Sequence, residues 1–200
     1  MSSFARIGVV LALAAAAALF LAPPNGAQKP SESDSSFGVR RFVRPEQPNI
    51  AGMRERWAAS DLVILGRVVD ERAELAADKS TVWTHYTLEV LQVFKHAGSG
   101  PEPKSLAITV EGGNVADGEV VLSVVNEVFP PLPWVREHVF FLRQNEDGNY
   151  RPLGGAQGVF RHDEQGQMRC HLPKPSWDFL CRSRDGSKWE DLIKDIKTKY

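Results

Sequence analysis

The side chains best suited to chemistry in this chain of 200 residues are its five histidines, which can act as general bases or bind a metal ion. They are His85, His96, His138, His162 and His171. The densest group of metal-binding residue types is His162-Asp163-Glu164. Neighbouring residues of a strand point to opposite faces, so these three converge poorly on one ion, and Gln165-Gly166 after them favours an exposed turn. We therefore predict no metal site.

Common short motifs of catalysis are absent from the sequence. There is no His-Glu-x-x-His pair, no Gly-x-Ser-x-Gly elbow, no phosphate loop and no dinucleotide fingerprint. The pairs Gly112-Gly113 and Gly154-Gly155 lie between predicted strands and indicate turns with positive φ. We predict no catalytic residue and no cofactor, while a Ser-His-Asp site assembled from distant residues stays open.

The only two cysteines, Cys170 and Cys181, predict one disulfide if the protein is exported to an oxidising compartment. Closing so short a loop would stabilise the fold by roughly 3 kcal/mol. Metal binding is the alternative, and His171 is the only further ligand type nearby. Since zinc usually takes four ligands, the disulfide is the favoured interpretation.

Residues 1–27 have the layout of a secretory signal peptide. Arg6 supplies a positive charge, residues 7–22 form an unbroken apolar run, and Ala27 offers a small residue for cleavage. The apolar run is shorter than the roughly 20 residues that span a bilayer, and an uncleaved membrane anchor is the alternative. The pattern predicts a secreted or periplasmic protein with no membrane span after cleavage.

The rest of the chain divides into a polar linker and one folded domain. Residues 28–48 are rich in Ser, Pro, Gln and charged residues, and this composition predicts a flexible linker. Residues 49–200 are enough for one domain with its own core. The formal net charge of −1 indicates no excess of basic residues, so nucleic acid is not expected as a partner.

Most of the domain has the periodicity of strands. Residues 62–69 are apolar on both faces, as a strand buried on two sides would be. In the long run 82–95 the apolar face changes at Leu91, which predicts a β-bulge or a sharp bend. A turn is indicated at Asp147-Gly148. Further strands are predicted at residues 106–110, 120–125, 138–143, 159–161 and 167–171.

A C-terminal amphipathic helix is predicted over residues 187–198, and Ser187 and Glu190 fit a capping box at its start. A shorter helix is expected within residues 49–60. These elements predict a mainly β fold, a small OB-like barrel of five or six strands with the C-terminal helix packed on it. The apolar stripe of this helix consists of Trp189, Leu192, Ile193 and Ile196.

The Pro-rich segment 129–134 is the strongest candidate for an interaction loop. Proline restricts the segment, so that Phe129 and Trp134, if exposed, would lose little entropy when they bind a partner. The alternative is a loop folded over the open end of the barrel. The exposed form would imply a protein partner, whose identity the sequence does not reveal.

A family likeness is carried by residues 59–68, 87–95, Gly112-Gly113, 137–142 and 156–160. Together they resemble poorly characterised exported bacterial proteins with an OB-like barrel, similar in architecture to the netrin/tissue-inhibitor-of-metalloproteinase class. Tissue inhibitors bind the zinc of their target through an N-terminal cysteine. No cysteine stands near Gln28, so the resemblance does not carry that mechanism to this chain.

The expected function is that of an exported, non-catalytic binding or interaction module. Two alternatives stay open: a peptidase-inhibitor-like or accessory protein, and a hydrolase or metalloenzyme with a site assembled from scattered residues. The enzyme would bring two or more histidines together with a carboxylate. The binding module would instead present exposed aromatic loops.

Overall fold

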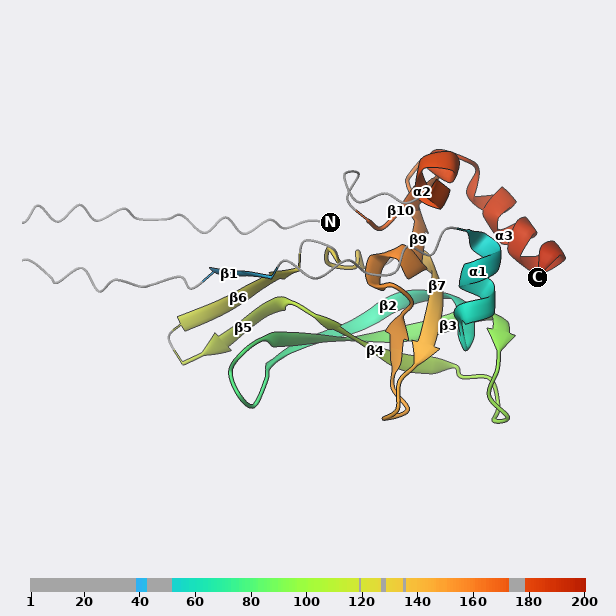
Figure 1. Ribbon diagram of the computed structural model, residues 1–200. Coiled ribbons are helices and arrows are strands. Elements are labelled where there is room, and N and C mark those ends of the chain that lie inside the picture. The colour runs from blue at the N-terminus through green and yellow to red at the C-terminus, as the bar shows by residue number, and fades with distance from the viewer. Residues whose placement is uncertain (1–38, 43–51, 119, 127–128, 135, 173–178) are drawn as a thin grey trace, which may run out of the picture. The chain divides into compact units, whose positions relative to one another are not determined.

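Strands dominate the computed structural model of the chain (Figure 1). The structure describes residues 39–42, 52–118, 120–126, 129–134, 136–172 and 179–200. All of them belong to one unit, Ser35–Tyr200. The predicted signal peptide 1–27 lies outside the described residues, and so does the predicted linker 28–48 except for residues 39–42.

Five strands close into a barrel. Antiparallel pairs join β7 to β2, β2 to β3 and β3 to β4. The short strand β8 completes the ring, because it pairs antiparallel with β7 and parallel with β4. The predicted mainly β barrel is thereby confirmed. Its strands are β2 (Leu62–Leu75), β3 (Val82–His96), β4 (Ser105–Glu111), β7 (Glu137–Gln144) and β8 (Tyr150–Pro152).

The core is centred on β7, whose residues 139–142 are all fully buried. Away from β2, this strand pairs first with β9 (Val159–His162) and then with β8. Phe160 of β9 packs edge-on against Phe141, with ring centroids 5.8 Å apart. Helix α1 (Met53–Ala59), shorter than the predicted helix, lies beside these strands. The continuous apolar sequence of β7 therefore belongs to a strand that is paired along both edges and covered on both faces.

The predicted change of face within β3 is confirmed. The pairing of β2 with β3 shifts register between Leu65 and Gly66, so that Leu91 of β3 has no partner across the pair. Leu91 consequently turns outward and is 40% exposed. A shift of this kind is a β-bulge, which bends a strand and helps two long strands to curve around a barrel.

A second sheet of three strands stands next to the long hairpin of β2 and β3 (Figure 1). It consists of β5 (Gly113–Asp117), β6 (Val120–Asn126) and β1 (Val39–Phe42). β5 pairs antiparallel with β6, and β1 pairs parallel with β6. Neither β5 nor β1 was predicted, and β1 lies inside the predicted linker. The predicted turn at Gly112-Gly113, with φ of 108° and 132°, separates β4 from β5.

The predicted disulfide is present and ties together the C-terminal segments. Cys170 in β10 (Met168–Cys170) is bonded to Cys181 in α2 (Phe179–Arg184), and their Cα atoms are 5.8 Å apart. Helix α3 (Trp189–Lys199) follows and buries most of the predicted apolar stripe. None of the helices that the structure describes is long and apolar enough to cross a membrane.

The predicted capping box at the start of α3 is wrong. The helix begins at Trp189, its N-cap is Lys188, and the Lys188 side chain makes no capping hydrogen bond. The backbone before it is already engaged, because the Ser187 carbonyl accepts the N–H of Met168 at 2.7 Å. Lys188 also forms a bridge with Gln167. The hydrogen bonds of the β9–β10 hairpin thus take the place of the local cap.

Candidate functional site

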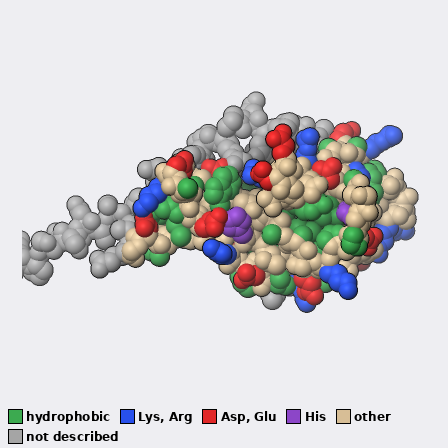
Figure 2. Space-filling model, turned by 90° about the horizontal axis from the view of Figure 1, so that it is seen from below, with side chains coloured by type: hydrophobic (Ala, Val, Ile, Leu, Met, Phe, Trp, Pro, Cys, Tyr) green, Lys and Arg blue, Asp and Glu red, His purple; other side chains and the backbone are tan. Residues whose placement is uncertain are grey.

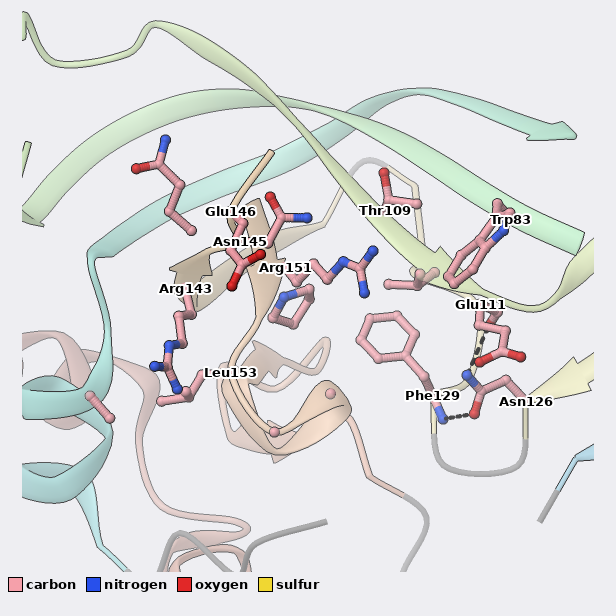
Figure 3. Close-up of a pocket in the computed structure, with 16 residues that line it drawn as sticks. Trp83, Thr109, Glu111, Asn126, Phe129, Arg143, Asn145, Glu146, Arg151 and Leu153 are labelled. Carbon is pink, nitrogen blue, oxygen red and sulfur yellow. Dashed lines mark hydrogen bonds between the residues drawn. The ribbon is translucent and has the colours of Figure 1, made fainter. Parts of the chain in front are cut away.

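A cleft of about 730 Å³ opens where β4 and β8 separate (Figure 3). The two strands, both fully described, pair at one position, Ile108 with Tyr150. Pro152 has no N–H to donate to a ladder, and β8 ends there. The predicted Gly154-Gly155 turn, with φ of 62° and 64°, then leads into the 3₁₀ helix η1 (Gly155–Gly158). The barrel is closed by a single bridge, and the gap beside it has the size of a ligand site.

One wall of the cleft is apolar and includes Val110, Phe129 and Leu153. Phe129 is only 5% exposed, and its backbone N–H donates to the side-chain oxygen of Asn126 at 3.1 Å. The Asn126 amide in turn donates to the Glu111 carbonyl at 2.7 Å, as Figure 3 shows. Asn126 thus joins β6 to β4 and holds Phe129 in position, so the apolar wall is already formed before any ligand binds.

Two arginines of the cleft oppose each other across the β7–β8 pair. Arg143 and Arg151 are direct neighbours in the register, and like charges in this arrangement destabilise an antiparallel pair. Both are exposed, and neither forms an ion pair with a carboxylate of the described residues. The Arg151 guanidinium lies over the Trp83 ring, 5.6 Å from its centroid. Figure 3 shows Arg151 directed towards Trp83 and Arg143 directed away from it.

Most other polar side chains of the lining form bonds within the fold. The Glu111 carboxylate accepts the Thr81 hydroxyl at 3.2 Å. The amides of Gln144 and Asn145 bond to the backbone of the turn that follows them. Glu146 is exposed and adds a negative charge to the lining. The two guanidiniums are therefore the groups of the cleft with most hydrogen-bonding capacity left for a ligand.

The predicted interaction loop, residues 129–134, has one buried end and one exposed end. Phe129 and Leu132 are buried, whereas Trp134 is 49% exposed. The Leu132 N–H donates to the Tyr86 hydroxyl at 3.5 Å, and the Trp134 indole N–H donates to Glu71 at 3.1 Å. The buried end packs into the core, while the other end keeps an aromatic ring at the surface. Binding of a partner by this loop stays a prediction.

Two of the histidines, His138 and His171, lie together in the core with ring centroids 6.5 Å apart. Burial lowers the pKa of His138 to about 3 and that of His171 to about 4, so both rings are neutral at neutral pH. Each bonds to a backbone carbonyl, His138 to Arg136 at 2.9 Å and His171 to Pro130 at 2.6 Å. No three His, Cys, Asp or Glu side chains of the described residues are grouped as metal ligands would be.

The His162-Asp163-Glu164 group belongs to the turn between β9 and β10, as the sequence indicated. The Asp163 carboxylate accepts the N–H groups of Gln165 and Gln167 and lies 2.7 Å from the Arg169 guanidinium. The hydrogen bond from Gln167, together with Arg169, holds the pKa of Asp163 below its usual value. The carboxylate thus fastens the hairpin.

A comparison of the chain with protein-family models and with curated proteins finds no match. The candidate site is therefore defined by geometry.

Trp83, Arg143 and Arg151 were not predicted as site residues. The opposition of the two arginines could have been predicted from the sequence, because Arg143 and Arg151 are each four residues from Asp147 of the predicted turn. A hairpin centred there brings them opposite each other. The separation of β4 from β8 depends on how distant segments pack, and no local pattern of residues encodes it.

Proposed function

We propose that the protein is an exported, non-catalytic binding module that holds a protein partner in the cleft between β4 and β8. One observation carries this proposal: Arg143 and Arg151 have no carboxylate partner among the described residues, and they border a cleft with a preformed apolar wall at Phe129. Hydrogen-bond donors left over in a cleft of this size are the groups that a ligand would satisfy.

Two further features support the exported, OB-like part of the proposal. The disulfide between Cys170 and Cys181 is of a kind that persists in oxidising compartments. The barrel closes in the order β2, β3, β4, β8, β7, which supports an OB-like barrel similar to the netrin/tissue-inhibitor-of-metalloproteinase class. We expect a cleaved signal peptide and a secreted or periplasmic location. Fractionation of cells that express the full chain, with intact mass measured on the exported form, tests both.

The proposal includes no chemical step. His138 and His171, the histidines that come together, are buried, neutral and bonded to backbone carbonyls. This environment is typical of core side chains rather than of a general base that reaches a substrate. On the face seen in Figure 2, acidic and basic side chains are interspersed, which supports a protein rather than a nucleic acid as partner.

The decisive test asks whether the cleft binds a ligand at all. In the ¹⁵N-labelled protein, each of the five tryptophans contributes an indole N–H resonance, and Trp83→Phe assigns the one in the cleft. Capped tetrapeptides with acidic, basic, aromatic or apolar side chains serve as probes. We expect at least one class to shift the Trp83 resonance and to leave that of Trp189, in α3, unmoved.

Other outcomes of this experiment contradict the proposal. If no peptide shifts Trp83, or if the shifts gather at α3, the cleft is not a binding site. Mass spectrometry of the peptides after incubation tests the non-catalytic part, since cleavage of a probe would identify an enzyme.

A further inference from the structure

We infer that the cleft selects a peptide segment that carries two separated carboxylates and a bulky apolar side chain. This inference rests on the proposed function and names the chemistry of the partner. Arg143 and Arg151 would each bind one carboxylate, and the wall at Phe129 would take the apolar side chain.

The charges point to a carboxylate ligand. Several other guanidiniums in the described part of the chain pair with carboxylates, as Arg67 does with Glu89 at 2.6 Å and Arg184 with Asp195 at 2.7 Å. Arg143 and Arg151 instead face each other across two strands. A carboxylate binds a guanidinium through charge-assisted, often bidentate hydrogen bonds, so an acidic ligand would both satisfy these donors and relieve their repulsion.

The directions of the two side chains point to an extended ligand. Figure 3 shows the Arg151 guanidinium turned towards Trp83, whereas Arg143 extends to another part of the cleft near Leu153. A single carboxylate could not bind both guanidiniums, because the two side chains extend to different parts of the cleft (Figure 3). Alternate side chains of an extended peptide lie on the same face, so two acidic residues in one segment provide the required separation.

The apolar wall adds a requirement for a bulky apolar side chain. Phe129 is fixed by Asn126 and packs edge-on against His171, with ring centroids 5.0 Å apart. A surface that is already ordered binds an apolar group without the entropic cost of forming it. Val110 and Leu153 extend the same wall.

A peptide fits this cleft better than an acidic polysaccharide does. Sugar rings bind aromatic residues by lying flat on an open ring face, and Arg151 already occupies one face of Trp83. A stacked guanidinium keeps its N–H edge directed outward for a carboxylate. The carboxylates of Glu111 and Glu146 also line the cleft, and Glu146 is expected to weaken any acidic ligand.

Fluorescence anisotropy with two labelled hexapeptides tests the inference. One alternates glutamate with leucine, and the other alternates glutamine with leucine. We expect the glutamate peptide to bind about tenfold more tightly, and its affinity to fall as salt is added. Arg143→Gln and Arg151→Gln should each remove most of this preference. Glu146→Gln should strengthen binding, which is an effect of the opposite sign.

The matched control is Arg54→Gln in α1, because Arg54 is exposed and does not line the cleft. Arg54→Gln should leave the affinity for the glutamate hexapeptide unchanged, and thermal melts of all variants should show that each one is folded. Equal binding of the two hexapeptides, with no effect of Arg143→Gln or Arg151→Gln, would overturn the inference that the ligand is acidic. In that case a shifted Trp83 resonance would still support binding in the cleft. Binding of oligogalacturonate in place of the glutamate peptide would overturn the inference in favour of a polysaccharide. If no probe moves the Trp83 resonance, the proposed function fails together with the inference.

Discussion

In strand β10, the guanidinium of Arg169 has acceptors on two sides, with Asp163 of the β9–β10 turn at 2.7 Å and Asp185 at 2.9 Å. In the cleft, Arg143 and Arg151 have no carboxylate partner among the described residues and stand opposite each other. The same side chain is thus used in two ways. The Arg169 guanidinium, which is paired with carboxylates, stabilises a hairpin. The two guanidiniums of the cleft lack carboxylate partners, so they weaken the fold and can bind a ligand.

The two regions meet at His171. This residue follows Cys170 of the C-terminal segment, and its ring packs against Phe129 in the cleft wall. Its neutral Nε2–H donates to the Pro130 carbonyl at 2.6 Å, which fixes the start of the predicted interaction loop. A change at His171 should therefore reach the cleft, whereas a change at Arg169 should stay within the hairpin.

The largest expected effect comes from acid. The pKa values of His138 and His171 fall from 6.5 in the unfolded chain to about 3 and about 4 in the fold, mainly because both rings are buried. Below about pH 6.5 the two imidazoles therefore bind protons in the unfolded chain but stay neutral in the folded one. Stability is full above that pH and should fall by several kcal/mol in total as the pH drops to about 4.

Urea unfolding at several pH values measures this loss, and His171→Gln isolates the contribution of one ring. The variant removes one titrating group and keeps a hydrogen-bond donor near Pro130, so its stability should depend less steeply on pH. An unchanged slope between pH 6.5 and 4 would mean that His171 does not carry the effect. The Asp163–Arg169 pair should persist over this range, because the pKa of Asp163 is lowered below 3.8.

The next largest effect is expected from the disulfide. The double variant Cys170→Ser and Cys181→Ser should lose about 3 kcal/mol of unfolding free energy, because the bond restricts the unfolded chain. Urea unfolding of the oxidised protein and the variant gives the difference. If the structure of the cleft does not depend on the disulfide, the folded variant should still bind the glutamate hexapeptide with the affinity of the parent protein. Loss of that binding below the melting temperature would show that the cleft depends on the disulfide.

A smaller loss is expected from Arg169→Gln. Its pairs with Asp163 and Asp185 are partly shielded from solvent, so the melting temperature should fall more than in Arg67→Gln, which breaks the exposed Arg67–Glu89 pair. The lowered pKa of Asp163 means that its bonds stabilise the fold above pH 3.8 and are lost below it. The difference between parent and variant should therefore be full at pH 7 and shrink in acid. Equal losses for the two variants would remove the distinction between a bracing pair and a surface pair.

Features that depend on a local repeat could be predicted from the sequence. The change of face at Leu91 indicated the bulge in β3, and the continuous apolar block at 139–142 indicated a strand buried on both faces. The disulfide followed from two cysteines in a chain expected to be exported. Each of these inferences needs only neighbouring residues or a count.

Features that depend on distant backbone partners could not be predicted in this way. Ser187 has the sequence of a cap, yet its carbonyl is taken by Met168 of the hairpin. β5 is a short strand without clear alternation, and its partner β6 decides its structure. The cleft exists because β4 and β8 pair at one bridge and then separate, so its lining residues are far apart in the chain.

The smallest expected effect has the opposite sign to all the others. Arg143→Gln removes one of two like charges that oppose each other across β7 and β8, so the unfolding free energy should rise by about 0.3 kcal/mol. The gain should disappear in high salt, because salt screens the repulsion between exposed charges. Arg54→Gln, which also removes one exposed positive charge, should show no such gain. Urea unfolding at low and high salt measures both variants. A loss of stability in Arg143→Gln would mean that Arg143 stabilises the fold as Arg169 does. A gain in stability together with weaker binding of the glutamate hexapeptide is expected only of a residue that binds a ligand and destabilises the fold.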